Sequence, residues 1–446
     1  MAKIGFLSLG CAKNRVDTEV MLGHLTRGGH EITASQEEAE IIVVNTCGFI
    51  ESSSQESIDS ILEMAQQKVA GNCRRLIVTG CLVERYRTQI MEQIPEVDAV
   101  IGTNEIPKIL DLCCDQTSRP DPPHYESREL YLYNDADPRI LTTPDYSAYI
   151  KVAEGCDHPC TFCVIPQLRG SFRSRPLDSI LSEARQLAVQ GVREINLVAQ
   201  DTTMYGWDWG NRLGLADLIR KLGKIEEIRW IRFLYAYPNN IYDELLQAMA
   251  DTPTACKYID VPLQHISRQV LKQMKRGGNR RSLTRLLKRI RDIVPGVAIR
   301  TTMIVGFPGE TEEDINELMD FVEEARFERL GVFTYSDEDN AASHPLGNKV
   351  PVDVKEERRQ QLMKLQAEIS KAGNLKLVGE TLPVLVEGVS KESDLLWQGR
   401  LSTQAPDIDG VVYLNDGITD QTRAGDIVPV RINTAHPYDL VGAVVQ

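Results

Sequence analysis

The stretch at residues 148–163, AYIKVAEGCDHPCTFC, places three cysteines directly after an apolar strand. Cys156, Cys160 and Cys163, here called the loop cysteines, follow the spacing Cys-x3-Cys-x2-Cys, so one loop can wrap a compact metal centre. A four-iron, four-sulfur cubane takes four ligands, and a loop with three leaves one iron open for a substrate or cofactor. The alternatives are chance clustering and a structural zinc site with His158 as fourth ligand, although a histidine so close to both neighbouring cysteines crowds a tetrahedron.

The strand before this loop is the first of six that alternate with helical patterns between Tyr146 and about Gly373. Such a series predicts an open or closed α/β barrel whose chemistry lies on the loops after the strands. The fifth strand ends in the glycine-rich turn IVGFPGET at residues 304–311, where glycine lets the backbone approach a ligand closely. The expected strands are Ala148–Ala153, Glu194–Ala199, Trp230–Tyr235, Tyr258–Val261, Ala298–Val305 and Leu330–Tyr335.

The region from Lys3 to about Asp115 also alternates short apolar strands with helical patterns. This alternation predicts a doubly wound parallel sheet covered by helices on both faces. Ser52, Ser53 and Ser54 precede one helical pattern, and their hydroxyls are expected to cap that helix. The expected strands are Lys3–Leu9, Ala39–Asn45, Arg74–Gly80 and Asp98–Gly102.

Three of these four strands lead into a cysteine: Cys11, Cys47 and Cys81, here called the edge cysteines. The carboxyl ends of parallel strands lie on one edge of a sheet, so residues far apart in sequence can converge there. We therefore predict a second three-cysteine cluster site. The alternative is that all three are buried thiols that pack as small hydrophobes. Burial in the core is also what we expect of the remaining cysteines, Cys73, Cys113, Cys114 and Cys256.

After Gly379 the pattern changes to short strands separated by turn residues, which predicts a small all-β barrel. The expected strands are Leu382–Glu387, Trp397–Leu401, Gly410–Leu414, Ile427–Ile432 and Leu440–Val444. We expect an N-terminal α/β domain at 1–117, a proline-rich linker at 118–141, the α/β barrel at 142–375 and the C-terminal barrel at 376–446.

The chain has 446 residues, ten cysteines and a formal net charge of −14 at pH 7. This acidic balance argues against a protein that binds nucleic acid over its whole surface, and makes a basic protein partner plausible. No signal peptide and no apolar run of membrane-span length is evident, so we expect a cytoplasmic protein without a membrane partner. A reducing compartment keeps thiols free, which favours metal binding over disulfides.

The loop cysteines, the aromatic Phe162 before the last of them and the barrel that follows resemble the radical S-adenosylmethionine superfamily. The resemblance implies that the open iron binds the amino and carboxylate groups of S-adenosylmethionine, and that the reduced cluster cleaves it to a 5′-deoxyadenosyl radical. It also implies that Phe162, Gln200, Ile304 and Gly306 contact this cofactor.

The chain as a whole resembles the methylthiotransferase family, through SLGCAKN at 8–14, NTCGF at 45–49, VTGC at 78–81 and a C-terminal barrel similar to the TRAM module. The resemblance implies that the loop cysteines hold the radical-generating 4Fe–4S cluster and that the edge cysteines hold an auxiliary 4Fe–4S cluster that carries sulfur. One S-adenosylmethionine methylates that sulfur, and a second yields the radical that activates a substrate carbon. An unactivated C–H bond offers no acidic proton, so we expect no acid–base catalytic side chain.

Three local phrases resemble the branch of this family that acts on an aspartate of small-subunit ribosomal protein S-twelve: Ala12-Lys13-Asn14, Gln200-Asp201-Thr202-Thr203 and Leu330-Gly331-Val332-Phe333. The stretch 376–446 has five bases and ten acids, so it should repel RNA phosphate and attract a basic protein. The alternatives are the branch that modifies tRNA adenosine and, in another class, an iron–sulfur electron carrier, which usually closes its clusters with four cysteines.

Residues 268–291 contain ten bases and no acid. One interpretation is a solvated barrel helix whose leucines face the sheet. The other is a local contact for ribosomal RNA or for the cofactor's carboxylate. The family resemblance further implies a reductant protein such as flavodoxin, and we expect a monomer.

Overall fold

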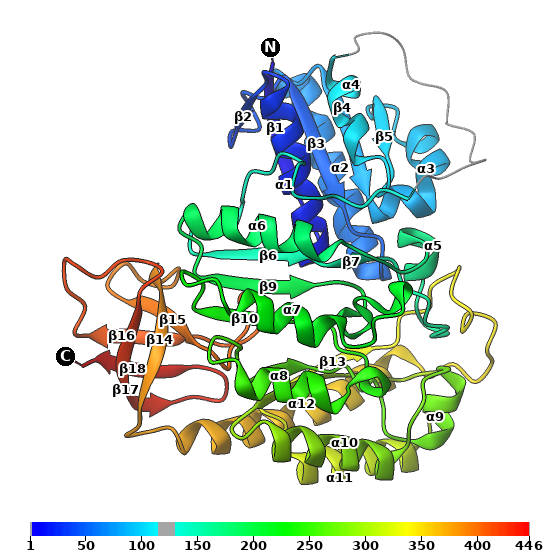
Figure 1. The fold of residues 1–446 in the computed structure, drawn as a ribbon. Helices are drawn as coiled ribbons and strands as arrows, with labels where there is room; N and C mark the ends of the chain where they lie inside the picture. Colours follow the sequence, from blue (N-terminus) through cyan, green and yellow to red (C-terminus); the bar gives the residue numbers. More distant parts are fainter. Residues whose placement is uncertain (1, 115–129, 446) are drawn as a thin grey trace.

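The structure, a computed structural model, describes residues 2–114 and 130–445 (Figure 1). The first half of the expected linker, residues 118–129, lies outside the described residues. In Figure 1 the N-terminal sheet, in blue and cyan, lies above an α/β barrel in green and yellow, and a small β-barrel in orange and red lies at one side.

The N-terminal part is a five-stranded parallel sheet with the order β2-β1-β3-β4-β5. The predicted parallel sheet is confirmed, and four of its strands lie where the sequence has apolar runs. The sequence does not predict β2, because its three residues are partly exposed and form no apolar run. The strands are β1 Lys3–Ser8, β2 Glu31–Thr33, β3 Ile41–Thr46, β4 Arg75–Gly80 and β5 Ala99–Ile101.

Helices cover both faces of this sheet, as the alternation predicts. One face carries α1 (Ala12–Arg27) and α4 (Ile109–Cys114), and the other carries α2 (Glu51–Ala70) and α3 (Cys81–Gln93). The predicted serine cap is wrong. Helix α2 already begins at Glu51, so residues 52–54 lie in its first turn, and its N-cap position has no side-chain hydrogen bond.

Six parallel strands form the central barrel in the order β6-β9-β10-β11-β12-β13. They make two three-stranded sheets, which a parallel bridge between Ile231 and Ala255 joins. Within the described residues β6 and β13 do not pair, so the predicted α/β barrel is confirmed in its open form. The strands are β6 Ser147–Lys151, β9 Glu194–Val198, β10 Trp230–Phe233, β11 Tyr258–Asp260, β12 Ala298–Val305 and β13 Arg329–Thr334.

The two faces of these strands have different neighbours. Ile150 and Leu197 are buried in a core with the outer helices, whereas Tyr149 and Val198 point the opposite way and belong to the core that includes α1. The outer helices are α6 Leu177–Val189, α7 Gly214–Leu222, α8 Asp243–Asp251, α10 Arg280–Ile293, α11 Glu312–Ala325 and α12 Val352–Leu375. Short elements complete the barrel: β7 Ala153–Glu154, α5 Ile165–Arg169, β8 Arg173–Ser174, α9 Arg268–Gln273, and 3-10 turns at Thr202–Met204, Trp207–Trp209 and Pro238–Asn240.

The C-terminal part is a closed five-stranded barrel with its own apolar core, as predicted. Its strand order is β14-β15-β16-β18-β17, in which only β16 and β18 are parallel. The strands are β14 Thr381–Val389, β15 Trp397–Leu401, β16 Val412–Asp416, β17 Ile427–Ala435 and β18 Leu440–Val444.

A buried ion cluster attaches this small barrel to the N-terminal ends of the central strands. Glu194, at the start of β9, accepts hydrogen bonds from Arg400 of β15 at 2.7 Å and from Arg232 of β10 at 3.2 Å. Asp407, in the loop after β15, pairs with Arg15 of α1 at 3.1 Å. The cysteine loop follows the opposite, carboxyl ends of the strands (Figure 1).

Candidate functional site

The edge cysteines follow three adjacent strands of the N-terminal sheet. Cys11 comes just before α1, Cys47 follows β3, and Cys81 opens α3 after β4. The chain is tightly packed here, because Gly10 has φ of +90° and a Cβ atom on it would lie 3.0 Å from the Cβ of Cys47. A Cβ atom on Gly48 would lie 3.1 Å from the carbonyl carbon of Cys81. The three strand ends therefore lie together at one edge of the sheet.

Positive charge faces the edge cysteines. Arg169 of α5 donates a hydrogen bond from Nη2 to the Sγ of Cys81 at 3.4 Å. Cys11 is solvent-exposed, and the positive charges of Lys13 and Arg169 lower the pKa of its thiol. Burial dominates at the other two thiols: it raises the pKa of Cys47, and it raises the pKa of Cys81 to about 12. Because the thiolate is the form that binds metals, binding of a metal cluster by these thiols would release protons.

A buried ionic cluster joins this edge to the barrel. Asp17 of α1 accepts hydrogen bonds from Lys151 of β6 at 2.5 Å and from Arg169 at 2.6 Å, and Glu154 of β7 accepts from both cations. Arg169 also donates to the Oδ1 of Asn14. All four charged side chains are at most 6% exposed, and breaking such a cluster costs about 3–5 kcal/mol. The cluster therefore fixes the orientation of the edge cysteines relative to the cysteine loop.

The loop cysteines lie between β7 and α5 in a loop that its neighbours hold at both ends. Gly155 has φ of +83°, and a Cβ atom on it would lie 2.1 Å from the carbonyl oxygen of Ser171, so glycine is required. Thr161 donates from its backbone N–H to the carbonyl of Met274 at 3.1 Å and from its hydroxyl to the carbonyl of Gln273 at 2.9 Å. The end of α9 thus forms one wall of the loop.

His158 is engaged with other side chains inside the loop. Its ring stacks on Tyr237 with 3.7 Å between centroids, and its Nε2 lies 2.6 Å from the Oδ2 of Asp201. Asn240 donates to the same carboxylate oxygen at 2.8 Å. These contacts engage Nε2 and one face of the ring, and they give the histidine a structural role within the loop.

The donor chemistry of both sites, three thiols in each, suits iron–sulfur clusters. Among residues 2–114 and 130–445, no group of three or more His, Cys, Asp or Glu side chains is arranged to hold one metal ion. Each thiolate of a cubane binds a different iron at a different corner, so the ligands need not meet at a point. Burial raises the pKa of Cys156 to about 11 and that of Cys163 to about 12, so binding of a cluster by these thiols would release protons.

The four expected cofactor contacts lie near the carboxyl ends of the barrel strands. Phe162 and Ile304 pack on one small apolar cluster with Phe307. Gln200 donates to Glu154 at 2.5 Å, while its own Oε1 is buried without a hydrogen-bond partner among the described residues. A buried amide oxygen of this kind calls for a partner, which a polar cofactor would supply.

The sequence suggests that Gly306 is glycine so that the backbone can approach a ligand, but the structure shows a second, local reason. It has φ of +77°, and a Cβ atom on it would lie 2.2 Å from the Cγ of Lys355 in α12. Its backbone N–H donates to the Oε1 of Glu310 at 2.8 Å. The described structure therefore explains this glycine by the packing of α12 against the turn.

No local pattern in the sequence marks which residues connect the two cysteine groups. The roles of Arg169, Asp17, Lys151 and Glu154 emerge only where α1 meets the barrel. A signal was present at Lys151 and Glu154, since both interrupt an otherwise apolar strand next to the cysteine loop.

The other four cysteines divide into two classes. Cys73, Cys113 and Cys256 are buried, as expected. The expectation is wrong for Cys114, which is exposed and has its Sγ 3.7 Å from the Nε2 of His30. Cys114 ends the short helix α4, and side chains at the end of a helix are less enclosed than those on its packed face.

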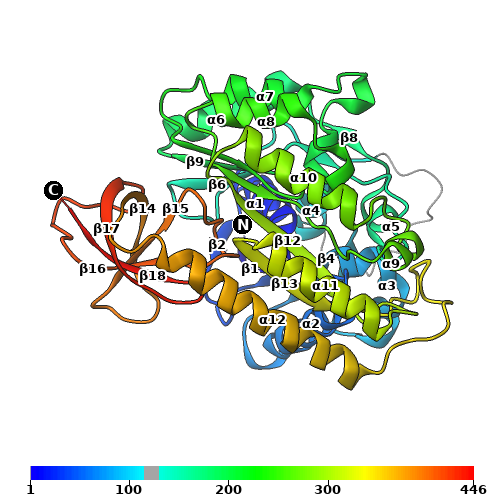
Figure 2. The same cartoon turned by 90° about the horizontal axis from the view of Figure 1, so that it is seen from below.

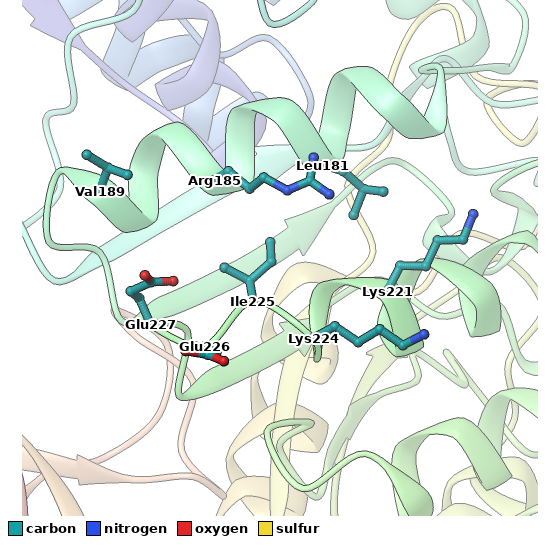
Figure 3. A pocket seen from close by; sticks show the side chains of 8 residues that line it. All are labelled: Leu181, Arg185, Val189, Lys221, Lys224, Ile225, Glu226 and Glu227. Atoms are coloured by element: carbon teal, nitrogen blue, oxygen red, sulfur yellow. The ribbon is translucent and has the colours of Figure 1, made fainter.

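A surface hollow lies away from both cysteine groups. Figure 3 shows its lining side chains on α6, at the end of α7 and in the segment after α7, among them Arg185, Lys221, Lys224 and Glu227. These helix ends lie at the N-terminal side of the barrel strands, opposite the cysteine loop. None of the predicted site residues lines the hollow. Separately, within the described parts of the chain, no helix has the length and apolar character needed to cross a membrane.

Three family models match the chain in series. The family described as uncharacterized protein family UPF0004 matches residues 3–102, the radical SAM superfamily matches 150–322, and the TRAM domain matches 378–445. A protein of Solibacter usitatus named ribosomal protein uS12 methylthiotransferase RimO is 55% identical over 99% of this chain and 94% of its own length. The chain belongs to the RimO family of methylthiotransferases.

Other relatives with the same name are also similar to this chain over nearly its full length. The RimO protein of Koribacter versatilis is 50% identical over 98% of this chain and 95% of its own, and that of Geobacter sulfurreducens is 48% identical over 100% and 99%. Among solved structures, the radical S-adenosylmethionine methyltransferase TsrM of Kitasatospora setae, with cobalamin and a 4Fe–4S cluster bound, has a TM-score of 0.56 at 16% identity and covers 77% of each chain. That similarity concerns the fold alone.

Proposed function

We propose that this protein transfers a methylthio group to an aspartate side-chain carbon of small-subunit ribosomal protein uS12. The observation that carries the proposal is the near-full-length identity of 46–55% to several proteins named ribosomal protein uS12 methylthiotransferase RimO. The three consecutive parts of the fold fit that chemistry, because Arg169, which follows the cysteine loop, bonds to Asp17 and to Cys81 of the N-terminal domain and so connects the two cysteine-bearing domains.

The loop cysteines are proposed to hold one 4Fe–4S cluster and the edge cysteines a second. When bound, the first cluster and S-adenosylmethionine together supply a 5′-deoxyadenosyl radical, and the second supplies the sulfur. Three cysteines in each group leave one iron free, which is what ligand exchange requires. Gln200, with its unpartnered buried oxygen, Phe162, Ile304 and Gly306 are proposed to line the S-adenosylmethionine site.

The chain's own residues act by positioning the two cysteine groups. Arg169 spans from the barrel to Cys81 and Asn14, and it keeps the edge cysteines at a fixed distance from the loop. Lys13, whose ammonium lies 3.4 Å from the ring centroid of Tyr235, places positive charge beside Cys11. Tyr235 has φ of +65°, a backbone conformation that bulky residues rarely adopt and that often marks a functional site.

The C-terminal barrel is proposed to hold the basic substrate protein. Its ten acids outnumber its five bases, and one of those bases, Arg400, is buried against Glu194 and leaves the outer surface still more acidic. Asp407 reaches Arg15 in the first turn of α1, so the barrel that would hold uS12 is also tied to the helix that follows Cys11.

The proposal extends to partners and organisation. A protein reductant such as flavodoxin would supply electrons, any ribosomal RNA contact would be local, and the enzyme would act as a cytoplasmic monomer. We propose domain bounds of 1–117, 142–375 and 376–446, with a linker at 118–141. The matched ranges 3–102, 150–322 and 378–445 each lie within one of these domains, which supports the bounds.

The test is anaerobic reconstitution with iron, sulfide, S-adenosylmethionine and dithionite. The reconstituted enzyme is offered uS12, assembled small subunits or tRNA. Mass spectrometry is expected to find a methylthio group on one aspartate of uS12. Modification of tRNA adenosine alone would overturn the proposed substrate, and an absence of methylthiolation from all three would overturn the proposed activity.

A further inference from the structure

One exposed surface of the barrel carries a concentration of positive charge that the rest of the chain does not neutralise. We call it the basic face. Its five residues are exposed, and no ion-pair partner for any of them is found in the described residues: Arg268, Lys272, Lys275, Arg281 and Arg285. Arg268 and Lys272 are four residues apart on α9, as are Arg281 and Arg285 on α10, so each pair lies on one side of its helix.

The other bases of residues 268–291 have structural partners, which separates them from the basic face. Arg280 pairs with Glu324 at 2.7 Å, and Lys288, Arg289 and Arg291 pair with nearby acids. The solvated-helix interpretation therefore explains one half of the charged segment. It does not explain the other half, the five unpaired bases of the basic face.

Helix α9, which carries part of the basic face, ends beside the cysteine loop. The loop residue Thr161 makes two hydrogen bonds to the end of α9, at Gln273 and Met274. Arg276, in the connection from α9 to α10, has its Nη1 3.6 Å from the Sγ of Cys160. Figures 1 and 2 both show α9 at the same end of the barrel as α5, which follows the cysteine loop.

Stacked planar groups connect this surface with the interior of the loop. The Arg276 guanidinium lies 4.5 Å from the ring centroid of Tyr237, and Tyr237 stacks on His158 at 3.7 Å. His158 stands between Cys156 and Cys160 in the loop. Polarisable groups thus extend from the α9–α10 connection to the cysteines.

We propose that the basic face docks an acidic protein that donates single electrons to the radical-site cluster. The inference rests on the proposed function, which requires that this cluster be reduced. The donor loses one electron and the cluster gains it, and no bond forms or breaks in the transfer. The chain's net charge of −14 repels an acidic donor elsewhere, so the basic face steers its approach to the cysteine loop.

An RNA would also be attracted by these bases, but position favours the electron donor. Electron transfer requires close approach to the cluster, and this surface forms a wall of the cysteine loop. RNA binding requires only phosphate contacts and would not explain the stack formed by Arg276, Tyr237 and His158.

The test compares two charge-reversal variants of the reconstituted full-length enzyme. The first is Arg281→Glu with Arg285→Glu. The control is Lys221→Glu with Lys224→Glu, which makes the same charge change at the end of α7, beside the hollow in Figure 3 and at the opposite end of the barrel. Neither variant touches the cysteine loop. Formation of 5′-deoxyadenosine is measured with purified reduced flavodoxin and, separately, with dithionite.

The first variant is expected to lose on the order of 10-fold or more in the flavodoxin-driven rate at low flavodoxin and low salt. Its dithionite-driven rate should match the wild type, and added salt should narrow the difference. The control should respond to flavodoxin like the wild type. An equal flavodoxin rate in all three proteins, or an equal loss with dithionite in the first variant, would overturn the docking surface.

Two further outcomes separate the alternatives. If the first variant loses affinity for a ribosomal RNA fragment but keeps its flavodoxin rate, the surface binds RNA and the inference is wrong. If wild-type enzyme fails to cleave S-adenosylmethionine even with dithionite, the proposed function fails, and the inference fails with it.

Discussion

Replacing Glu194 by glutamine is expected to loosen the C-terminal barrel from the central barrel. Glu194 is fully buried and is the shared counter-ion of Arg400 and Arg232. Burial alone would raise the pKa of this carboxyl, but the two arginines outweigh burial and lower it from 4.5 to about 2. A shift of that size corresponds to about 3 kcal/mol of stabilisation by the ionised carboxylate. Glutamine carries no charge, so the substitution leaves two buried guanidinium groups without their shared carboxylate.

The assay is hydrogen exchange of the backbone amides in β15, which contains Arg400. A loss of about 3 kcal/mol should speed local opening on the order of 100-fold at pH 7. The pH dependence follows from the lowered pKa. The stabilisation is complete above about pH 4.5 and is lost as pH falls toward 2, so the difference between wild type and Glu194→Gln should shrink over that range.

Glu387→Gln is the matched control. Glu387 also accepts a hydrogen bond from Arg400, at 2.5 Å, but its side chain is 16% exposed and Arg400 keeps Glu194 when Glu387 is changed. This variant should lose about 1 kcal/mol or less. Equal effects of the two substitutions, or a Glu194→Gln effect that is the same at pH 7 and pH 3, would refute the role assigned to the buried carboxylate.

Three other predictions concern the cysteine sites. Cys11→Ala should reduce the iron content of the reconstituted enzyme from about eight to about four atoms per chain. It should abolish methylthiolation while S-adenosylmethionine cleavage continues. Retention of all the iron would contradict the assignment of Cys11. Arg169→Met should lower the stability of the domain junction by about 3–5 kcal/mol, because Asp17 and Glu154 lose a buried partner. The measurement is thermal unfolding, and a Tm equal to that of the wild type would argue against the buried ionic cluster. Gly155→Ala should prevent cluster binding at the loop cysteines and abolish S-adenosylmethionine cleavage. The control is Gly191→Ala, which should retain both, because Gly191 also has a positive φ, of +108°, but has open space around it. Equal behaviour of the two variants would disprove the close approach of Gly155 to Ser171.

Local patterns predict most of the secondary structure because each signal lies within a few residues. Apolar runs mark β1, β3 and β4, and every strand that the sequence predicts in the two barrels lies within a few residues of its expected position. The misses have physical causes. Strand β2 is a short, partly exposed edge strand, and the Ser52–Ser54 cap fails because the chain turns into α2 one residue earlier, at Glu51.

The sequence by itself determined which thiols stand at strand ends, since parallel connectivity places every carboxyl end of a sheet on one edge. It also determined the acidic character of the C-terminal barrel and the basic character of residues 268–291, because charge is a property of composition. Only the tertiary structure decided how these parts face one another. Arg169 meets Cys81 across 88 residues of sequence, and Arg400 meets Glu194 across 206. Such pairs form where separately folded surfaces are desolvated together, and no local pattern in the chain encodes that burial.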